Sequence, residues 1–253
     1  MPEYGPSTYG ERIASVYDAF VEPIVGSSTE AAVAFLTELA GGGPALELGI
    51  GTGRVALPLA ARGVRVEGID ASAAMVEQLR GKPGGAEMRV SLGDFAAVEV
   101  EGTFRLIYVV FNTLFALLEQ EEQVGCFRSV ARHLAEDGAF VVEAFVPDPT
   151  LYDRSQRVSA TRVEVDRVAF DAARIDLASQ RITTQHVLIG REGITLLPVQ
   201  LRYAWPSELD LMARLAGLEL RERFAGWRRE AFTSTSPGHV SVYGRRTADG
   251  SAW

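Results

Sequence analysis

Residues 44–63 read PALELGIGTGRVALPLAARG, and this stretch decides the fold. The apolar run at 44–49 predicts a buried strand, the GIGTG segment at 49–53 predicts a tight loop, and the residues up to Gly63 have the composition of a helix that ends at a glycine. A strand, a glycine-rich loop and a helix in this order are the first unit of a parallel α/β sheet.

The same alternation continues for about eighty residues. The further strands are expected at 64–70, 88–95, 104–112 and 139–146, and the further helices at 72–80 and 121–134. Ser72 is expected to cap the first of these helices, and a turn at 136–138 to precede the last strand. Strands buried on both faces and alternating with helices predict a Rossmann-like, mostly parallel seven-stranded sheet with flanking helices.

The pattern changes on both sides of this region. Residues 161–205 contain three runs of alternating polar and apolar residues, which predict antiparallel strands, and we expect a β insertion at 155–205 before the last helix. The last helix is expected at 207–216, capped by Ser207, with a terminal hairpin at 218–227 and 239–246. Helices are also expected at 9–20 and 29–40, so residues 1–28 form an N-terminal helical arm of a single domain spanning 1–253.

Composition narrows the classes of function. The 25 basic and 33 acidic residues give a formal charge of −8, which disfavours a nucleic-acid partner. The single cysteine, Cys126, excludes an intrachain disulfide, and the N-terminal residues lack the pattern of a signal peptide. No apolar run approaches the roughly 18 residues of a membrane span, so we expect a cytoplasmic protein without a membrane anchor.

The glycine-rich loop carries the first functional signal. Gly49 and Gly51 allow a ligand to approach the backbone, and the loop follows a strand at the edge where open α/β sheets bind ligands. A dinucleotide-binding loop would have its third glycine at position 54, which is Arg54, and would have no use for the acid at Glu47. A carboxylate at Glu47 repels phosphate but can hold a ligand ammonium group, directly or through water.

Two more acids follow the next two strands. Asp70 ends the second strand, where a carboxylate accepts hydrogen bonds from ribose hydroxyls. Asp94 follows the third strand, where a carboxylate can accept a hydrogen bond from the exocyclic amine of adenine. Three acids after three successive strands predict a site for an amino-acid-bearing nucleoside.

With these motifs the sequence resembles the class I S-adenosylmethionine-dependent methyltransferases, over most of the chain. The resemblance implies S-adenosyl-L-methionine as cofactor and S-adenosyl-L-homocysteine as product. It places Glu47 and the glycine loop at the methionine moiety, Asp70 at the ribose, and Asp94 with Phe95 at adenine. The implied cofactor-binding residues are Tyr9, Tyr17, Glu47, Gly49, Ile50, Gly51, Gly53, Asp70, Ala71, Met75, Asp94, Phe95 and Phe111.

The resemblance also bears on the substrate side. Phe111 and Asn112 match the position that faces both cofactor and substrate, and Asn112 is alternatively a turn residue that caps a strand end. We assign Asn112 and Phe115 to substrate binding. Tyr9 and Tyr17 look like the lid helix of the family. More narrowly, the chain is similar to bacterial secondary-metabolite N-methyltransferases, those of aminosugars and of peptide antibiotics.

The remaining candidates are weaker. His133 is interpreted as a surface residue and His239 as a turn residue, while His186 is left open between core, lid surface and substrate contact. Three scattered histidines do not predict a metal site. Trp205 and Trp227 are interpreted as core or hinge anchors, and no catalytic base is assigned, although Tyr17, Glu143 and the insertion are considered.

The resulting hypothesis is an enzyme of secondary metabolism that N-methylates a small amine-bearing metabolite by direct in-line transfer, with the insertion as a substrate cover or a dimer arm. The alternatives are an O-methyltransferase acting on a hydroxyl or carboxylate, a nucleoside-binding protein without catalysis and, last, a nicotinamide-dependent oxidoreductase. We expect a small-molecule substrate, no nucleic-acid or membrane partner and, if the insertion is a dimer arm, a homodimer.

Overall fold

The computed structural model describes residues 4–191 and 193–246, with the backbone alone described for 22–27. Its centre is a seven-stranded sheet, sheet A, with the strand order β10-β11-β5-β4-β1-β2-β3. The strands of sheet A are β1 (Ala45–Leu48), β2 (Val66–Asp70), β3 (Arg89–Leu92), β4 (Phe104–Val109), β5 (Leu134–Phe145), β10 (Leu218–Phe224) and β11 (Gly238–Arg245). Strands β1 to β5 are parallel, and β11 runs antiparallel to both of its neighbours, β5 and β10, so β10 has the direction of the first five; this confirms the predicted mostly parallel sheet.

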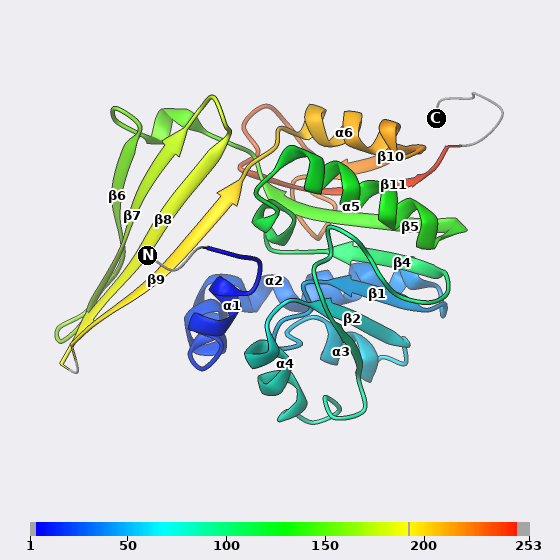
Figure 1. Cartoon of the computed structure of the whole chain (residues 1–253), viewed down its shortest axis with the longest axis horizontal. Helices are drawn as coiled ribbons and strands as arrows, with labels where there is room; N and C mark the ends of the chain where they lie inside the picture. The colour runs from blue at the N-terminus through cyan, green and yellow to red at the C-terminus, as the bar shows by residue number, and fades with distance from the viewer. Residues whose placement is uncertain (1–3, 192, 247–253) are drawn as a thin grey trace.

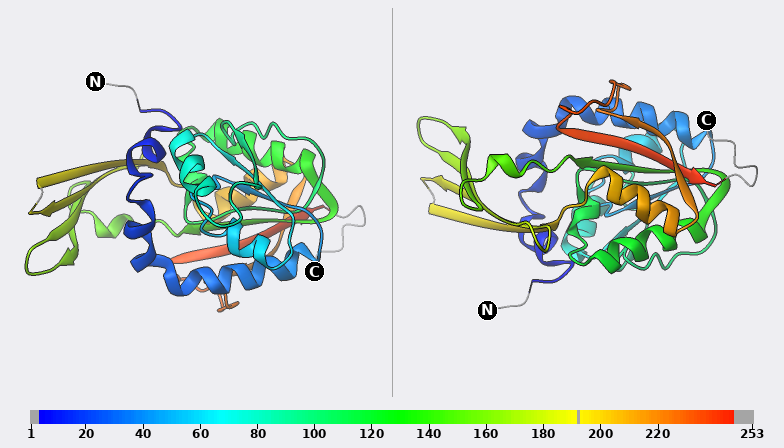
Figure 2. Two further views of the ribbon diagram at one scale, coloured as in Figure 1. Left: turned by 90° about the horizontal axis from the view of Figure 1, so that it is seen from below. Right: turned by 90° about the horizontal axis from the view of Figure 1, so that it is seen from above.

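Helices cover both faces of sheet A, as Figure 2 shows. The helices are α1 (Thr8–Ile13), α2 (Tyr17–Ala40), α3 (Ala56–Ala61), α4 (Ala73–Arg80), α5 (Gln120–His133) and α6 (Pro206–Leu215), with short 3-10 turns η1 (Thr113–Ala116) and η2 (Pro149–Leu151). Apolar residues of α2 and α3 share one core cluster, while those of α5 and α6 share another. None of the helices in the described part of the chain is long and apolar enough to span a membrane.

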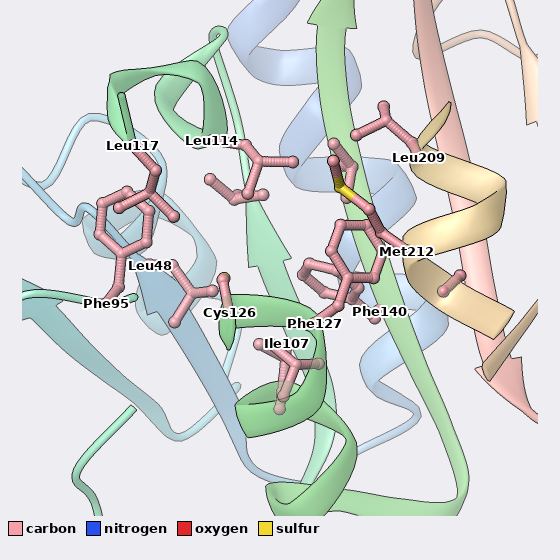
Figure 3. Packing of buried hydrophobic residues seen from close by; sticks show 14 of the residues in the cluster. Leu48, Phe95, Ile107, Leu114, Leu117, Cys126, Phe127, Phe140, Leu209 and Met212 are labelled. Carbon is pink, nitrogen blue, oxygen red and sulfur yellow. The ribbon is translucent and has the colours of Figure 1, made fainter. Parts of the chain in front are cut away.

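The central strands are buried on both faces. Along β4, Ile107 and Val109 belong to the cluster on the α5–α6 side, and Leu106 and Tyr108 to the cluster on the α2–α3 side. This alternation is the two-residue period of a strand. Figure 3 shows the α5–α6 side, where Phe127 packs at 5.2 Å from Phe140, measured between ring centroids. Burying an aromatic side chain of this size contributes about 1.5–3 kcal/mol.

The N-terminal region differs from the prediction of helices at 9–20 and 29–40. Helix α1 ends at Ile13, and α2 then runs without a break from Tyr17 to Ala40. Residues 23–28 have low helix propensity, but the second half of α2 packs Val33 and Leu36 fully into the core, and this packing outweighs local propensity. Residues 1–3 of the expected arm lie outside the described residues.

Three local predictions were wrong and one is confirmed. The turn expected at 136–138 lies within β5, which already begins at Leu134 and carries an irregular register there. Ser207 does not cap α6, because the helix begins one residue earlier with Pro206 in its first position. The expected three runs of the insertion form four strands. Ser72 does cap α4, since its Oγ accepts a hydrogen bond from Met75 N at 3.2 Å.

The insertion forms a separate antiparallel sheet, sheet B, which precedes the last helix as predicted. Its strands are β6 (Gln156–Val163), β7 (Val168–Asp176), β8 (Arg181–Gly190) and β9 (Gly193–Arg202), paired in this order. Turns at 164–167 and 177–180 divide two of the three predicted runs. Sheet B stands to one side of sheet A, with α1 and the start of α2 between them (Figures 1 and 2).

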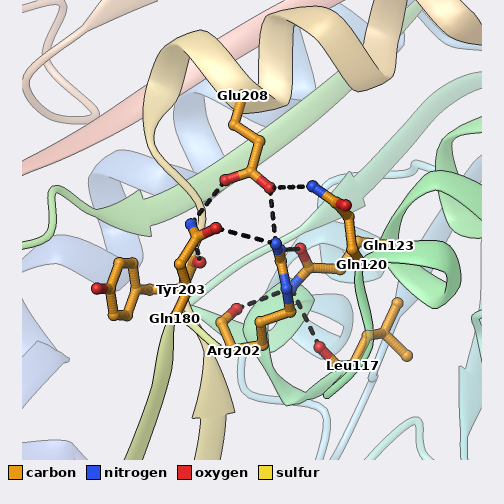
Figure 4. A network of polar contacts seen from close by, with 7 residues as sticks. All are labelled: Leu117, Gln120, Gln123, Gln180, Arg202, Tyr203 and Glu208. Atoms are coloured by element: carbon orange, nitrogen blue, oxygen red, sulfur yellow. Dashed lines mark hydrogen bonds and ion pairs between the residues drawn. The ribbon is translucent and has the colours of Figure 1, made fainter. Parts of the chain in front are cut away.

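A buried ionic network joins the end of sheet B to the helices of sheet A (Figure 4). Arg202, at the end of β9, donates to Gln123 of α5 at 2.7 Å and to Glu208 of α6 at 2.8 Å. Gln180, before β8, donates to the second oxygen of Glu208 at 2.8 Å. Because Arg202 is 5% exposed, these contacts fix where sheet B leaves the main body.

Candidate functional site

The glycine-rich loop follows β1 at the centre of sheet A. Gly49 and Gly51 have φ of +72° and +55°, a backbone conformation that favours glycine. A Cβ at Gly49 would lie 2.4 Å from Thr113 Cγ2, whereas a Cβ at Gly51 would meet nothing within 4 Å. Gly49 therefore allows the Thr113 side chain to pack directly against the loop backbone, and Gly51 exposes its backbone to open space that a ligand can enter.

Asp70 connects this loop to the end of β2. Its Oδ2 accepts a hydrogen bond from Gly51 N at 2.7 Å, and its Oδ1 accepts one from Ser72 N at 2.9 Å. Burial raises the pKa of this carboxyl group, although the backbone hydrogen bonds act in the opposite direction. Each oxygen keeps a further lone pair, so the carboxylate can also accept hydrogen bonds from two neighbouring ligand hydroxyls.

Glu47 lies beneath the loop and is 2% exposed. Its Oε2 accepts a hydrogen bond from the Tyr108 hydroxyl at 3.0 Å. Burial raises the pKa of Glu47 to about 8, since an ionised carboxylate is poorly stabilised in this environment. A ligand ammonium group close to Glu47 would favour the ionised form, so the residue is suited to hold a cation.

Arg54 is not among the predicted cofactor-binding residues, but the structure places its side chain beside them. Its guanidinium donates to the Tyr17 hydroxyl and to Thr29 Oγ1, and its Cζ lies 5.4 Å from the ring centroid of Phe111. It therefore joins α2, the glycine loop and the end of β4. The sequence signal was its place, where a dinucleotide-binding loop has its third glycine.

Asp94 and Phe95 follow β3. Asp94 Oδ1 accepts a hydrogen bond from Ala96 N at 2.9 Å, which shapes the loop. Phe95 is 8% exposed, and its ring lies 3.7 Å from the position of a Cβ at Gly49. The loops after β1, β2 and β3 thus lie at one edge of sheet A, as expected for parallel strands.

A cavity of about 1620 Å³ lies between this edge of sheet A and the inner face of sheet B. Four of the residues that the sequence predicted for the site line this cavity: Tyr9, Tyr17, Phe111 and Asn112. Its aromatic side chains come from the N-terminal arm, from the ends of β4 and β5, and from the segments just before β6 and just after β9: Tyr4, Tyr9, Tyr17, Phe20, Phe111, Phe145, Tyr152 and Trp205. A small organic molecule with a cationic group fits such a lining.

Other predicted site residues lie in the protein core. Phe115 is fully buried, with its ring centroid 5.1 Å from that of Phe145, and does not line the cavity. Met75 and Ile50 are 4% and 3% exposed, and Ala71 is half-buried between Asp70 and the Ser72 cap. Gly53 ends the loop with φ of +79°.

Asn112 and Glu143 hold the segment after β4. Asn112 adopts φ of +63°, and its Oδ1 accepts a hydrogen bond from Phe145 N at 2.7 Å, so it caps a strand end as well as lining the cavity. Glu143 accepts hydrogen bonds from Phe111 N and from Trp227 Nε1, both at 2.7 Å. Burial raises the pKa of Glu143. These contacts fix Phe111 at the cavity wall and make Trp227 a structural anchor.

The N-terminal arm is docked onto the loops after β1 and β2. Glu11 of α1 accepts a hydrogen bond from Ser72 Oγ at 2.8 Å. Asp18 of α2 accepts one from Thr52 Oγ1 and pairs with Lys82, both at 2.6 Å. The arm therefore closes the glycine loop from the cavity side.

The three histidines have different environments. His133 contacts the Gly102 carbonyl near the surface, while His239 is buried in β11 and hydrogen-bonds to Ser241, so it is not a turn residue. Burial lowers the pKa of His239 to about 4. His186 lines the cavity and is the functional candidate that sequence reasoning left open. No metal-binding group of three His, Cys, Asp or Glu residues occurs in the described part of the chain.

This sheet order, with a glycine-rich loop after β1 and an acid at or just beyond the carboxyl end of each of β1, β2 and β3, defines a nucleoside-binding α/β protein. Residues 45–138 match the family model described as a methyltransferase domain. A cypemycin N-terminal methyltransferase from a Streptomyces species is 30% identical over 95% of this chain and 99% of its own length.

Solved structures agree with this result. The CcbJ methyltransferase from Streptomyces caelestis is 39% identical, covers 96% of this chain and 100% of its own, and has a TM-score of 0.90. CalS10, an amino pentose methyltransferase from Micromonospora echinaspora solved with its cofactor, shares the fold at 23% identity and a TM-score of 0.68, over 91% of this chain and 97% of its own.

The chain belongs to the class I S-adenosylmethionine-dependent methyltransferases, and it is an enzyme with S-adenosyl-L-methionine as cofactor. The residues present fit this cofactor. Gly51 leaves open space beside the backbone, Asp70 keeps acceptor capacity for hydroxyls, and the buried Glu47 is suited to a cationic group.

Proposed function

We propose that this enzyme transfers a methyl group to an amine nitrogen of a small metabolite of bacterial secondary metabolism. The observation that carries the proposal is the aromatic cavity that begins at Phe111 and ends on sheet B. Aromatic rings stabilise a bound ammonium group through their electron-rich faces and exclude water around it. The two relatives named for their amine substrates, the N-terminal methyltransferase and the amino pentose methyltransferase, support the same chemistry.

The proposal assigns the cofactor to the loops after β1, β2 and β3. Glu47 and the backbone of Gly49 and Gly51 would bind its amino-acid end, Asp70 its ribose hydroxyls, and Asp94 with Phe95 its adenine. Tyr9, Tyr17 and Arg54 would cover it from the arm side. The supporting geometry is the Gly51–Asp70 hydrogen bond, which fixes two of these loops to each other.

Methyl transfer depends more on the orientation of the two reactants than on a series of proton-transferring side chains. The cofactor supplies an activated methyl group, and the protein must hold an amine lone pair in line with it. Correct placement of two reactants can lower a barrier by roughly 7–11 kcal/mol in the best-oriented cases. Phe111, fixed by Glu143 through its backbone, would form the wall against which the amine is placed.

Sheet B is proposed to cover the substrate. Strands β6 to β9 supply one wall of the cavity, and the Arg202 network anchors them to the helices of sheet A. The division of the chain into an arm, a methyltransferase domain and a cover stays a prediction, as do a homodimer formed through sheet B and a cytoplasmic location.

A panel of acceptors tests the proposal. Purified protein is incubated with methyl-labelled cofactor and with matched amines and phenols, including aminosugars and a peptide with a free N-terminus. We expect label on nitrogen in at least one amine and none in the phenols. Label on oxygen alone would favour the O-methyltransferase alternative, and cofactor binding without transfer to any acceptor would favour a nucleoside-binding protein.

A further inference from the structure

A histidine and an aspartate face each other across two neighbouring strands of sheet B. Asp171 on β7 and His186 on β8 are paired directly in the antiparallel register. Nδ1 of His186 lies 2.5 Å from Oδ1 of Asp171, and the two side chains are 20% and 31% exposed. A histidine that donates its Nδ1 proton to a carboxylate presents an unprotonated Nε2 on the other side of the ring.

Both side chains line the cavity, on the wall opposite the ends of β4 and β5. The imidazole centroid of His186 lies 5.2 Å from the ring centroid of Phe20 on α2. Phe20 follows Tyr17 by three residues and so shares its helix face, and Tyr17 is hydrogen-bonded to Arg54 at the end of the glycine loop. His186 is therefore connected through Phe20 and Tyr17 of α2 to Arg54, which lies at the end of the loop where the methyl donor is proposed to bind.

Asp171 is the ionisable group that contacts His186, and the strand positions around His186 carry side chains without charge. The positions facing it on the strands beside it are not ionisable: Ala169, Thr184, Leu188, Thr195, Leu197 and Val199. The arm contributes Tyr9 and Tyr17, and burial raises the pKa of both hydroxyls, so they stay neutral. The other charged groups of the cavity wall have partners of their own: Arg157 of β6 donates to Ser159 at 3.3 Å, Arg162 of β6 and Arg167 pair with Glu164, and Arg191 pairs with Asp166. Asp148, before β6, accepts hydrogen bonds from Thr150.

We propose that His186 is the base that removes the proton from the substrate amine, with Asp171 as its positioning residue. This inference rests on the proposed function. An N–H bond of the bound ammonium breaks, the proton passes to Nε2 of His186, and the electron pair stays on nitrogen. That pair forms the new C–N bond while the C–S bond of the methyl donor breaks with its electrons on sulfur. His186 then releases the proton to water.

A base at this position would supply the neutral form of the amine, which is the form that reacts. A primary amine with a pKa near 10.4 is neutral in only about one molecule in 2,500 at pH 7. Loss of hydration in the cavity lowers the pKa of an ammonium group, by up to about 3–5 units when burial is complete, and cation–π contacts of about 0.5–2 kcal/mol offset part of this shift. The cavity thus brings the amine closer to the range of a histidine, and Asp171 stabilises the imidazolium that forms.

Kinetics provide the first test, with an amine that the wild-type enzyme methylates in the acceptor panel. His186→Gln should lower kcat/KM by about 10²- to 10⁴-fold, the usual contribution of a general base. The wild-type rate should fall at low pH through one titration, and the variant should lack that step. His133→Gln, which changes a surface histidine, should match the wild type, and calorimetry should give all three proteins the same affinity for S-adenosylhomocysteine. A His186→Gln enzyme within threefold of wild type, with the same pH profile, would overturn the proposal.

Nitrogen-15 NMR of the imidazoles provides a second test that needs no substrate. Wild-type protein should show His186 with a proton on Nδ1 and none on Nε2. Asp171→Asn should shift the proton toward Nε2, and Asp171→Glu should return it to Nδ1. In the kinetic assay, Asp171→Asn should slow catalysis and Asp171→Glu should restore it. A wild-type His186 with its neutral proton on Nε2 would overturn the assignment.

The two proposals can fail separately. If none of the amines is methylated, the proposed function is wrong, and the NMR measurement still decides whether His186 presents a free Nε2. If hydroxyl groups alone are methylated, the proposed function is again wrong, and the pH profile of His186→Gln decides whether this residue takes the proton of the acceptor.

Discussion

The backbone N–H of Gly51 donates a 2.7 Å hydrogen bond to Oδ2 of Asp70, which joins the loop after β1 to the end of β2. The carboxylate therefore has a structural role, which is to hold the glycine loop, and a proposed binding role toward a ribose. Because the two roles use different lone pairs of the same group, they can be exercised together.

Replacing Asp70 should weaken cofactor binding strongly. Hydrogen bonds to charged groups contribute about 1.5–3 kcal/mol each, so Asp70→Ala should raise the Kd for S-adenosylhomocysteine by roughly 10- to 100-fold in isothermal titration calorimetry. The matched control is Asp137→Ala, which removes an exposed carboxylate at the opposite end of sheet A. Equal affinity of the two variants would contradict the proposed site.

The two glycines of the loop should respond differently to substitution by alanine. Gly49→Ala places a methyl group 2.4 Å from Thr113 Cγ2 at a φ of +72°, and we expect a loss of about 2–4 kcal/mol in the free energy of unfolding. Gly51→Ala meets no protein atom within 4 Å, so it should lose about 1–2 kcal/mol but bind cofactor poorly. Urea denaturation and calorimetry together separate the effects. The reverse order of stability would show that the loop packs differently.

Glu47 should make the stability of the cofactor-free protein depend on pH. Its pKa is about 8 in the folded state and near 4.5 when unfolded, so the folded state holds the proton more tightly. Its ionisation therefore lowers the free energy of unfolding as pH rises from 4.5 to 8, by up to a few kcal/mol.

The variant Glu47→Gln lacks this titration. It should match the wild type near pH 5 and exceed it in stability near pH 9, as measured by urea denaturation at several pH values without cofactor. Glu99→Gln, at an exposed position, serves as control and should follow the wild-type curve. Parallel curves for wild type and Glu47→Gln would show that Glu47 is ionised throughout.

Arg202 should contribute far more to stability than the neighbouring surface ion pair. Arg202→Met leaves Glu208 and Gln123 without their buried partner, and we expect a loss of about 3–5 kcal/mol. The Arg181–Glu119 pair is exposed, so Arg181→Ala should cost less than about 1 kcal/mol. The double variant Arg202→Met with Glu208→Gln should recover part of the loss. Similar melting temperatures for Arg202→Met and Arg181→Ala would mean that the network does not anchor sheet B.

Local pattern predicted the part of the fold that local physics controls. The loop at 49–53 and the acids Glu47, Asp70 and Asp94 lie at strand ends, and parallel strands bring their carboxyl ends to one edge. Errors occurred where distant packing decides the backbone. Helix α2 continues through a stretch of low helix propensity because its second half is buried. Strand β5 includes residues 136–138, which were predicted to form a turn.

The amino-acid sequence alone determined the α/β class, the glycine loop and the three acids. These features depend on the hydrophobic period of strands and helices and on glycine positions, which are properties of short segments. Tertiary structure decided which side chains share the cavity. Arg54 meets Tyr17 and Phe111, and Asp171 meets His186, only through helix docking and strand register. A one-residue shift between β7 and β8 would turn one of the last two side chains to the opposite face of sheet B, so no short segment could have paired them.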